Sequence, residues 1–101
     1  MKVVFLPAAE HDLGGLFAYI SEKLQNSIAA HNIVEKILRL AYKLASFPEM
    51  GASLKTIDTR IGSYRYLLVD NYLIIYKVEA QEVNVVRILY ARSDYVRLLQ
   101  D

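Results

Sequence analysis

The feature that most limits how this chain can fold is a set of three closely spaced apolar runs in its second half, at residues 64–69, 72–78 and 83–90. Tyr, Val, Ile and Leu dominate these runs, and such a composition is typical of β-strands. Only Asp70 and Asn71 separate the first two runs, which is the spacing of a tight hairpin turn. Residues 79–82 supply the next reversal. The second half of the chain therefore predicts a three-stranded antiparallel meander.

A hairpin that turns at Asp70 and Asn71 determines which residues lie opposite one another, because paired positions in a hairpin keep a constant sum. A second reversal centred on Ala80 and Gln81 extends the same arithmetic to the third strand. The predicted pairs are Arg65 with Tyr76, Leu67 with Ile74, Val69 with Tyr72, Val85 with Tyr76 and Arg87 with Ile74.

Both faces of this predicted meander carry apolar side chains. One face holds Arg65, Leu67, Val69, Tyr72, Ile74, Tyr76, Val85, Arg87 and Leu89. The other holds Tyr64, Tyr66, Leu68, Leu73, Ile75, Val86, Ile88 and Tyr90. A pair of helices covers only one face of a sheet, and an apolar sheet surface left exposed marks an interface. We expect the face with Arg65 and Arg87 to stay partly open and to bind a partner.

The first half of the chain has the pattern of one strand followed by two helices. Residues 3–6 are apolar and end at Pro7, which suits the first position of a helix. Apolar residues recur at helical spacing over residues 8–24, and again from Ser27, the expected N-cap, to about residue 47. So short a break between two helices favours an antiparallel hairpin.

A short C-terminal helix, capped by Ser93 and running to Leu99, completes the prediction. The expected fold is α+β in a small single domain over residues 1–101: an N-terminal strand, an antiparallel helix hairpin, a three-stranded antiparallel meander and the final helix. A chain of 101 residues with 54% hydrophobic residues can bury a core without a metal or a disulfide.

Composition and charge narrow the classes of function. The net charge of +1 is too small to attract a polyanion over a long range. The absence of Cys excludes thiol catalysis, and His11 and His31 lie on different predicted helices without ligand-spaced carboxylates, so we expect no metal and no cofactor. Neither a membrane-spanning run nor a signal-peptide core occurs, and we expect a cytoplasmic protein that does not bind membranes.

The candidate functional residues gather near the end of the chain. The Arg and Tyr residues of interest are Arg65, Arg87, Tyr90, Arg92 and Tyr95, together with Lys55 and Arg60. Arginine matches phosphate oxygens, tyrosine stacks on bases, and both dominate protein interfaces. A structural role is equally open, in which Arg87 pairs with a carboxylate while Tyr90 and Tyr95 close the core.

Four motifs, in this order, resemble those of the RelE/ParE superfamily of toxins from type II toxin-antitoxin systems. They are Ala9-x-x-Asp12-Leu13 with Tyr19-Ile20, Phe47-Pro48-Glu49-Met50-Gly51, Tyr72-Leu73-Ile74-Ile75-Tyr76, and Arg87-Ile88-Leu89-Tyr90-Ala91-Arg92-Ser93-Asp94. The resemblance spans essentially the whole chain and is closer, at the last motif, to the ParE-like branch, which includes plasmid stabilisation proteins.

The resemblance implies a growth-inhibiting toxin with two protein partners. ParE-like toxins bind DNA gyrase and have no established active site, and a cognate antitoxin neutralises them. By this resemblance the target-binding residues are Arg87, Tyr90, Arg92 and Tyr95, and the antitoxin-binding residues are Arg65, Leu67, Tyr72, Ile74 and Tyr76. A homodimer and a heterotetramer with the antitoxin are both open.

Two alternatives stay beside this interpretation. In the RelE-like branch, the chain would be a ribosome-dependent endoribonuclease that cleaves mRNA, with Arg65, Arg92 and Tyr95 as candidate catalytic residues. Leu67 and Leu73 stand where such nucleases often carry Lys or Arg, and the loss of cations weakens stabilisation of a phosphate transition state, so we favour binding over catalysis. The second alternative is a non-toxic module that binds only an antitoxin.

Overall fold

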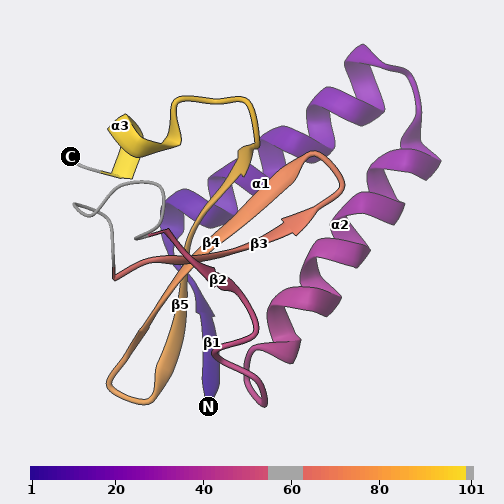
Figure 1. Cartoon of the computed structure of the whole chain (residues 1–101). Helices are drawn as coiled ribbons and strands as arrows, with labels where there is room; N and C mark the ends of the chain where they lie inside the picture. The colour runs from indigo at the N-terminus through magenta and orange to yellow at the C-terminus, as the bar shows by residue number, and fades with distance from the viewer. Residues whose placement is uncertain (55–62, 100–101) are drawn as a thin grey trace.

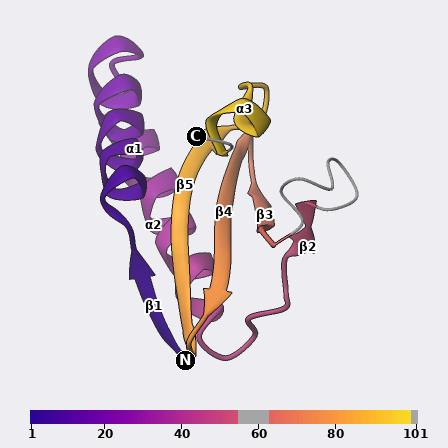
Figure 2. The ribbon, with the colours of Figure 1, turned by 90° about the vertical axis from the view of Figure 1, so that its left-hand side faces the viewer.

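The computed structural model describes residues 1–54 and 63–99 of the chain. Two of the candidate functional residues, Lys55 and Arg60, lie outside this part. The elements are β1 (Lys2–Phe5), α1 (Pro7–Ala18), a π-helix η1 (Tyr19–Lys23), α2 (Ser27–Lys43), β2 (Ala52–Ser53), β3 (Arg65–Val69), β4 (Tyr72–Glu79), β5 (Glu82–Tyr90) and α3 (Tyr95–Leu99). Helices α1 and α2 form an antiparallel pair on one side of the sheet, and α3 lies on the other side (Figures 1 and 2). The predicted α+β class is confirmed.

The sheet has five strands in the order β1-β5-β4-β3-β2, so that β1 and β2 form its edges. The N-terminal strand β1 lies parallel to β5, with Lys2 opposite Glu82 and Phe5 opposite Val85. Sequence reasoning did not predict β2, which is only two residues long and pairs with the start of β3. Along the chain, the helix pair follows β1 and precedes the meander, and β1 returns to the same sheet as the neighbour of β5.

The predicted register of the first hairpin is confirmed, because Arg65 lies opposite Tyr76, Leu67 opposite Ile74 and Val69 opposite Tyr72. The second reversal also turns at the predicted residues, Ala80 and Gln81, which have positive φ angles of 47° and 63°. Such angles match the twist of a tight two-residue hairpin turn.

The predicted pairing of Arg87 with Ile74 is wrong. The register between β4 and β5 shifts after the pair of Tyr76 and Val85, and Arg87 then lies opposite Ile75. Val86 is the extra residue of a β-bulge, which bends the strand and changes the direction of the side chains that follow it.

The expectation that the face with Arg65 and Arg87 stays open is also wrong. Helices α1 and α2 cover it, and Ile74, Tyr76 and Val85 are fully buried there. The physical reason is that both faces are apolar, so the residue pattern alone could not decide between them. The opposite face packs Leu73, Ile75 and other apolar residues against α3 in a smaller cluster.

Two predicted caps differ from the observed ones. Asn26, not Ser27, caps α2, because its Oδ1 accepts a hydrogen bond from the Ala29 N–H at 3.0 Å. At α3, the Ser93 hydroxyl donates to the Tyr90 carbonyl at 2.7 Å, and the first helical hydrogen bond runs from Leu98 to Asp94.

None of the helices in the described part of the chain has the length and apolar composition of a membrane span.

Candidate functional site

Arg87, one of the predicted functional residues, forms a two-point ion pair with Asp12. Its Nε and Nη2 donate to the two carboxylate oxygens of Asp12 at 2.7 and 2.9 Å, and the Ile88 N–H donates to the same carboxylate at 3.0 Å. The hydrogen bonds with Asp12 raise the pKa of Arg87 above its usual value. These bonds join β5 to α1, so Arg87 has the structural role that the sequence left open, a pair with a carboxylate. Its role in target binding stays a prediction.

Arg65 is engaged in a second network, together with Tyr76. The Tyr76 hydroxyl donates to the Pro48 carbonyl at 2.8 Å and accepts from the Gly51 N–H at 2.9 Å. Arg65 Nη1 donates to the Gly51 carbonyl at 2.8 Å. Burial raises the pKa of Tyr76, which keeps the phenol in its neutral, donating form. The network fixes the segment that leads from α2 to β2.

The sheet divides the four predicted target-binding residues. Tyr90 is exposed and lies beside Tyr72, with ring centroids 5.7 Å apart, on the side of the sheet that faces the helix pair. Tyr95 packs on the other side with Leu73 and Ile75, and Arg92 is exposed in the turn between β5 and α3. These residues therefore do not form one continuous patch.

The candidate nuclease residues are divided in the same way. Arg65 lies directly opposite Tyr76, whose side chain is in the core beneath the helices, whereas Tyr95 belongs to the cluster on the other face. Arg65 is also occupied with the Gly51 carbonyl. General acid and base groups must reach the same phosphate within hydrogen-bond distance, and Arg65 and Tyr95 approach from opposite faces of the sheet.

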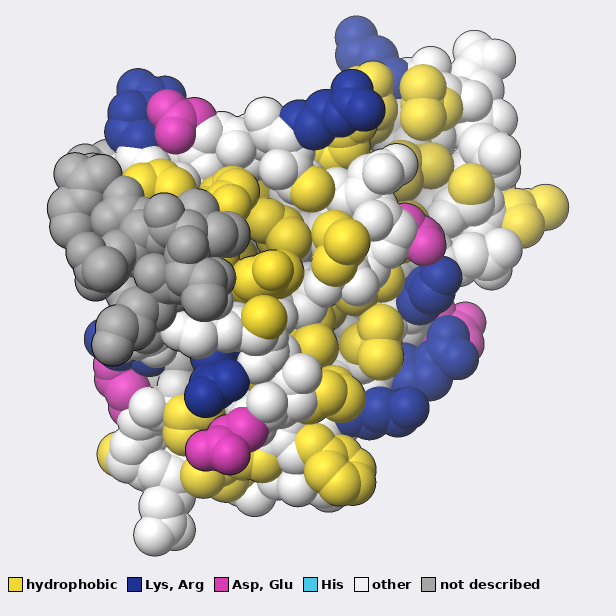
Figure 3. Space-filling model, viewed as in Figure 1, with side chains coloured by type: hydrophobic (Ala, Val, Ile, Leu, Met, Phe, Trp, Pro, Cys, Tyr) yellow, Lys and Arg dark blue, Asp and Glu magenta, His cyan; other side chains and the backbone are white. Residues whose placement is uncertain are grey.

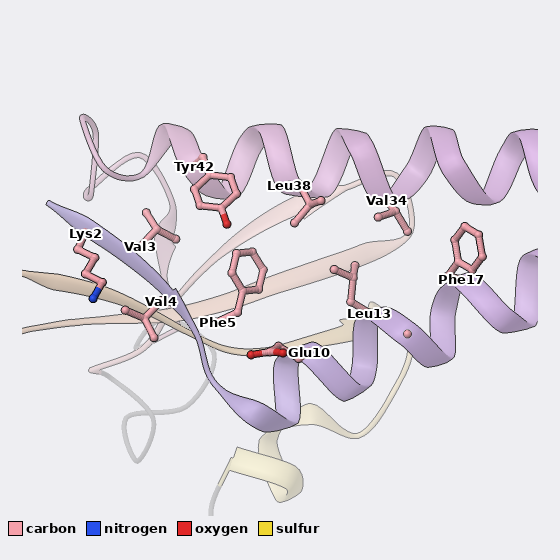
Figure 4. Close-up of a pocket in the computed structure, with 11 residues that line it drawn as sticks. Lys2, Val3, Val4, Phe5, Glu10, Leu13, Phe17, Val34, Leu38 and Tyr42 are labelled. Atoms are coloured by element: carbon pink, nitrogen blue, oxygen red, sulfur yellow. The ribbon is translucent and has the colours of Figure 1, made fainter.

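One apolar surface that is available to a partner is a groove of about 680 Å³ between the helix pair and the edge strand β1. Figure 4 shows Leu13, Val34 and Leu38 pointing into the space between the two helices and the strand. The complete lining is Lys2, Val3, Val4, Phe5, Glu10, Leu13, Gly14, Phe17, Val34, Leu38 and Tyr42, which we call the hairpin groove.

A second apolar surface is the face of the sheet opposite the helix pair. Hydrophobic side chains gather at the middle of this face in Figure 3. Leu68 is 61% exposed there. A hollow of about 210 Å³ beside it is lined by Leu54, Tyr66, Leu68, Leu73, Ala91 and Tyr95. Sequence reasoning expected the open face on the other side of the sheet, with Arg65 and Arg87; on this side Leu68 is exposed, while Leu73 and Ile75 are buried.

No group of three or more His, Cys, Asp or Glu side chains among residues 1–54 and 63–99 is placed to hold a metal ion.

The sequence profile of the "ParE toxin of type II toxin-antitoxin system, parDE" matches residues 3–95. The chain belongs to the ParE toxin family. The solved structure of the "Chromosomal ParDE TA system from P. aeruginosa" is similar in fold, with a TM-score of 0.76 and 18% sequence identity over 91% of this chain and 97% of that one. No curated protein sequence matches the chain significantly.

Several residues that shape this ParE chain were missed as functional residues or seen only as parts of motifs. Asp12 appears in the first family motif, but the bond to Arg87 depends on the packing of α1 against β5. Gly51 ends the Phe-Pro-Glu-Met-Gly motif, and the structure shows why glycine suits this position: a Cβ there would lie 2.6 Å from the Tyr66 carbonyl oxygen and the Tyr76 hydroxyl. An acidic residue beside an apolar helical stripe was the available signal for Asp12.

Proposed function

We propose that this ParE family member is a toxin that stops growth by binding DNA gyrase, and that a cognate antitoxin neutralises it. The observation that carries the choice of binding over RNA cleavage is the separation of Arg65 from Tyr95 by the sheet. A nuclease needs these groups around one phosphate, whereas a protein surface can use them separately. Because gyrase acts on the chromosome, the proposal places the chain in the cytoplasm.

The charges of the chain support the same choice. Leu67 and Leu73 supply no cation on the central strands, and the net charge is +1. Arg65 and Arg87 already have partners in the fold, through the Gly51 carbonyl and the Asp12 carboxylate. An enzyme that cleaves RNA gains most of its rate from groups held ready for the charge of the transition state.

For the antitoxin we propose the hairpin groove as the main docking surface. Apolar side chains of α1, α2 and β1 line it, and Lys2 and Glu10 are its charged residues. An amphipathic helix can place its apolar side in such a groove. Of the antitoxin contacts expected from the sequence, Ile74 and Tyr76 have no exposed surface, so the groove takes their place. Arg65, Leu67 and Tyr72 are half-buried and stay in the proposal.

The experiment that tests the target is pulse labelling of DNA and protein synthesis within minutes of inducing this chain alone in bacteria. If DNA synthesis falls first and the DNA damage response rises, the gyrase proposal stands. If translation stops first and ribosome-bound mRNA is cut, the chain is a nuclease and the proposal fails. If neither changes while the purified chain binds the antitoxin tightly, the chain is a non-toxic antitoxin-binding module.

A further inference from the structure

A cup lined by three tyrosines lies beside α1, on a different face of that helix from the hairpin groove. The groove uses Leu13 and Phe17, whereas the cup uses Asp12 and Leu16. The cup has a volume of about 550 Å³. Its lining is Asp12, Leu16, Tyr19, Asn71, Tyr72, Ile88, Leu89 and Tyr90.

The three tyrosines come from three different elements. Tyr72 opens β4 and lies opposite Tyr90 at the end of β5, with the two rings tilted by 59°. Tyr19 begins the π-helix η1 at the end of α1. Tyr19 and Tyr90 are 55% and 45% exposed, which is a large share for aromatic side chains. Burial, and then the neighbouring Tyr90 and Tyr19, raise the pKa of Tyr72.

The remaining residues of the cup form an apolar floor. Leu16 and Ile88 are buried there and belong to the core beneath the helices, and none of the lining residues is Lys or Arg. The one carboxylate, that of Asp12, is already paired with Arg87. A neighbouring hollow shares Tyr72 and contains Lys36, whose ammonium is paired with Asp70 at 2.9 Å. The cup is therefore rich in π-faces and phenol oxygens and carries no unpaired cation on its lining.

We propose that this cup binds the side chain of an arginine or lysine on a protein partner of the toxin. The hydrocarbon stem of such a side chain fits the apolar floor of Leu16 and Ile88. Its cationic head then lies against the faces of Tyr72 and Tyr90, where aromatic rings attract cations. The phenol oxygens and the Asn71 amide oxygen accept its hydrogen bonds. This inference goes beyond the proposed function, because it requires a partner with an exposed cation and does not depend on gyrase.

The test is a titration of the purified full chain with N-acetyl-arginine amide, followed by NMR of the tyrosine ring signals. The matched probe is N-acetyl-citrulline amide, which has almost the same shape and no charge. We expect the arginine probe to shift the signals of Tyr19, Tyr72 and Tyr90 together and to saturate, and the citrulline probe to bind more weakly. Tyr19→Leu should weaken binding of the arginine probe about two- to fivefold. Tyr42 is an exposed tyrosine of the hairpin groove, and Tyr42→Leu should leave binding of the arginine probe unchanged.

Three results would overturn the inference: equal shifts with both probes, no saturable shift of the three rings, or equal effects of Tyr19→Leu and Tyr42→Leu. The melting temperature of each variant shows whether it is folded. If Tyr19→Leu does not fold, Tyr90→Leu tests a second exposed tyrosine of the cup. Because the readout is binding of a small probe, its failure is distinct from a failure of the gyrase proposal.

Discussion

The guanidinium of Arg87 and the carboxylate of Asp12 form a two-point ion pair across 75 residues of sequence, at 2.7 and 2.9 Å. The side chains are only 25% and 9% exposed, so the pair lies largely out of water. The same carboxylate accepts the Ile88 N–H just beyond the bulge in β5. The Asp12 carboxylate of α1 thus pairs with the guanidinium of Arg87 and accepts the hydrogen bond of the Ile88 N–H, both in β5.

Asp12→Ala should destabilise the fold strongly, because it leaves the Arg87 guanidinium and the Ile88 N–H without their acceptor. We expect a loss of about 3 kcal/mol in the free energy of unfolding, measured by urea denaturation. The matched control is Asp94→Ala, which removes the exposed pair with Arg97 and should change stability little. Equal effects of the two variants would contradict the role of Asp12.

Gly51→Ala should also destabilise the chain, since its new Cβ would lie 2.6 Å from the Tyr66 carbonyl oxygen. A backbone atom cannot move aside as a flexible side chain can, and overpacking of this kind costs about 1–3 kcal/mol. Gly15→Ala is the control, because no atom beyond its chain neighbours and the adjoining helix backbone lies within 4 Å of its Cβ position. That substitution within α1 should stabilise the protein by about 1 kcal/mol. A Gly51→Ala variant as stable as the parent in thermal unfolding would refute the close approach.

The stability of the fold should fall at alkaline pH. Burial raises the folded-state pKa of Tyr76, so its contribution is complete below the unfolded-state pKa of about 10 and is lost as the pH rises through the higher folded value. Tyr72 acts in the same direction. The free energy of unfolding should therefore be level between about pH 7 and 9 and decline above about 10.

Tyr76→Phe separates this effect from general alkaline unfolding. At neutral pH the variant should lose about 2 kcal/mol, because the Pro48 carbonyl and the Gly51 N–H lose their partner. Its alkaline decline should be shallower than that of the parent, as one linked proton is gone. Identical alkaline slopes in urea titrations would show that Tyr76 is not the titrating group.

Leu38→Glu should weaken antitoxin binding, because it puts a charge into the apolar lining of the hairpin groove. Loss of one buried leucine contact predicts a decrease in affinity of about ten- to a hundredfold, measured by calorimetry with the purified antitoxin. Leu68→Glu, on the opposite face of the sheet, is the control and should bind normally. If Leu68→Glu alone weakens binding, the antitoxin occupies the sheet face and not the groove.

Arg92→Ala should relieve growth inhibition without loss of stability, because Arg92 is exposed in the turn between β5 and α3. Colony counts after induction measure the first effect, and thermal unfolding of the purified variant measures the second. Arg97→Ala, which removes another exposed arginine close by, should leave toxicity intact. A lower melting temperature for Arg92→Ala would assign the residue a structural role.

Local chemistry predicted the first hairpin and the elements other than β2 and the π-helix η1 from the sequence. The strand composition around Asp70 and Asn71 was enough to place Arg65 opposite Tyr76 and Leu67 opposite Ile74, because a two-residue turn leaves little freedom in register. The helical spacing of apolar residues likewise predicted α1 and α2, although Asn26 takes the cap that Ser27 was expected to provide. These features depend on residues close together in the chain.

The tertiary structure alone decided which face of the sheet is covered and where Arg87 points. Both faces are apolar, so the choice depends on how α1 and α2 pack across Ile74, Tyr76 and Val85, and no local pattern contains that information. The bulge at Val86 lies next to the hydrogen bond from the Ile88 N–H to Asp12, a residue far away in the chain. The sequence by itself determined the α-helices, the strands other than β2, the first hairpin and the likeness to the ParE family. Only the packing of distant segments determined the groove, the tyrosine cup and the pairing of Arg87, because each requires side chains from elements that are far apart in the chain.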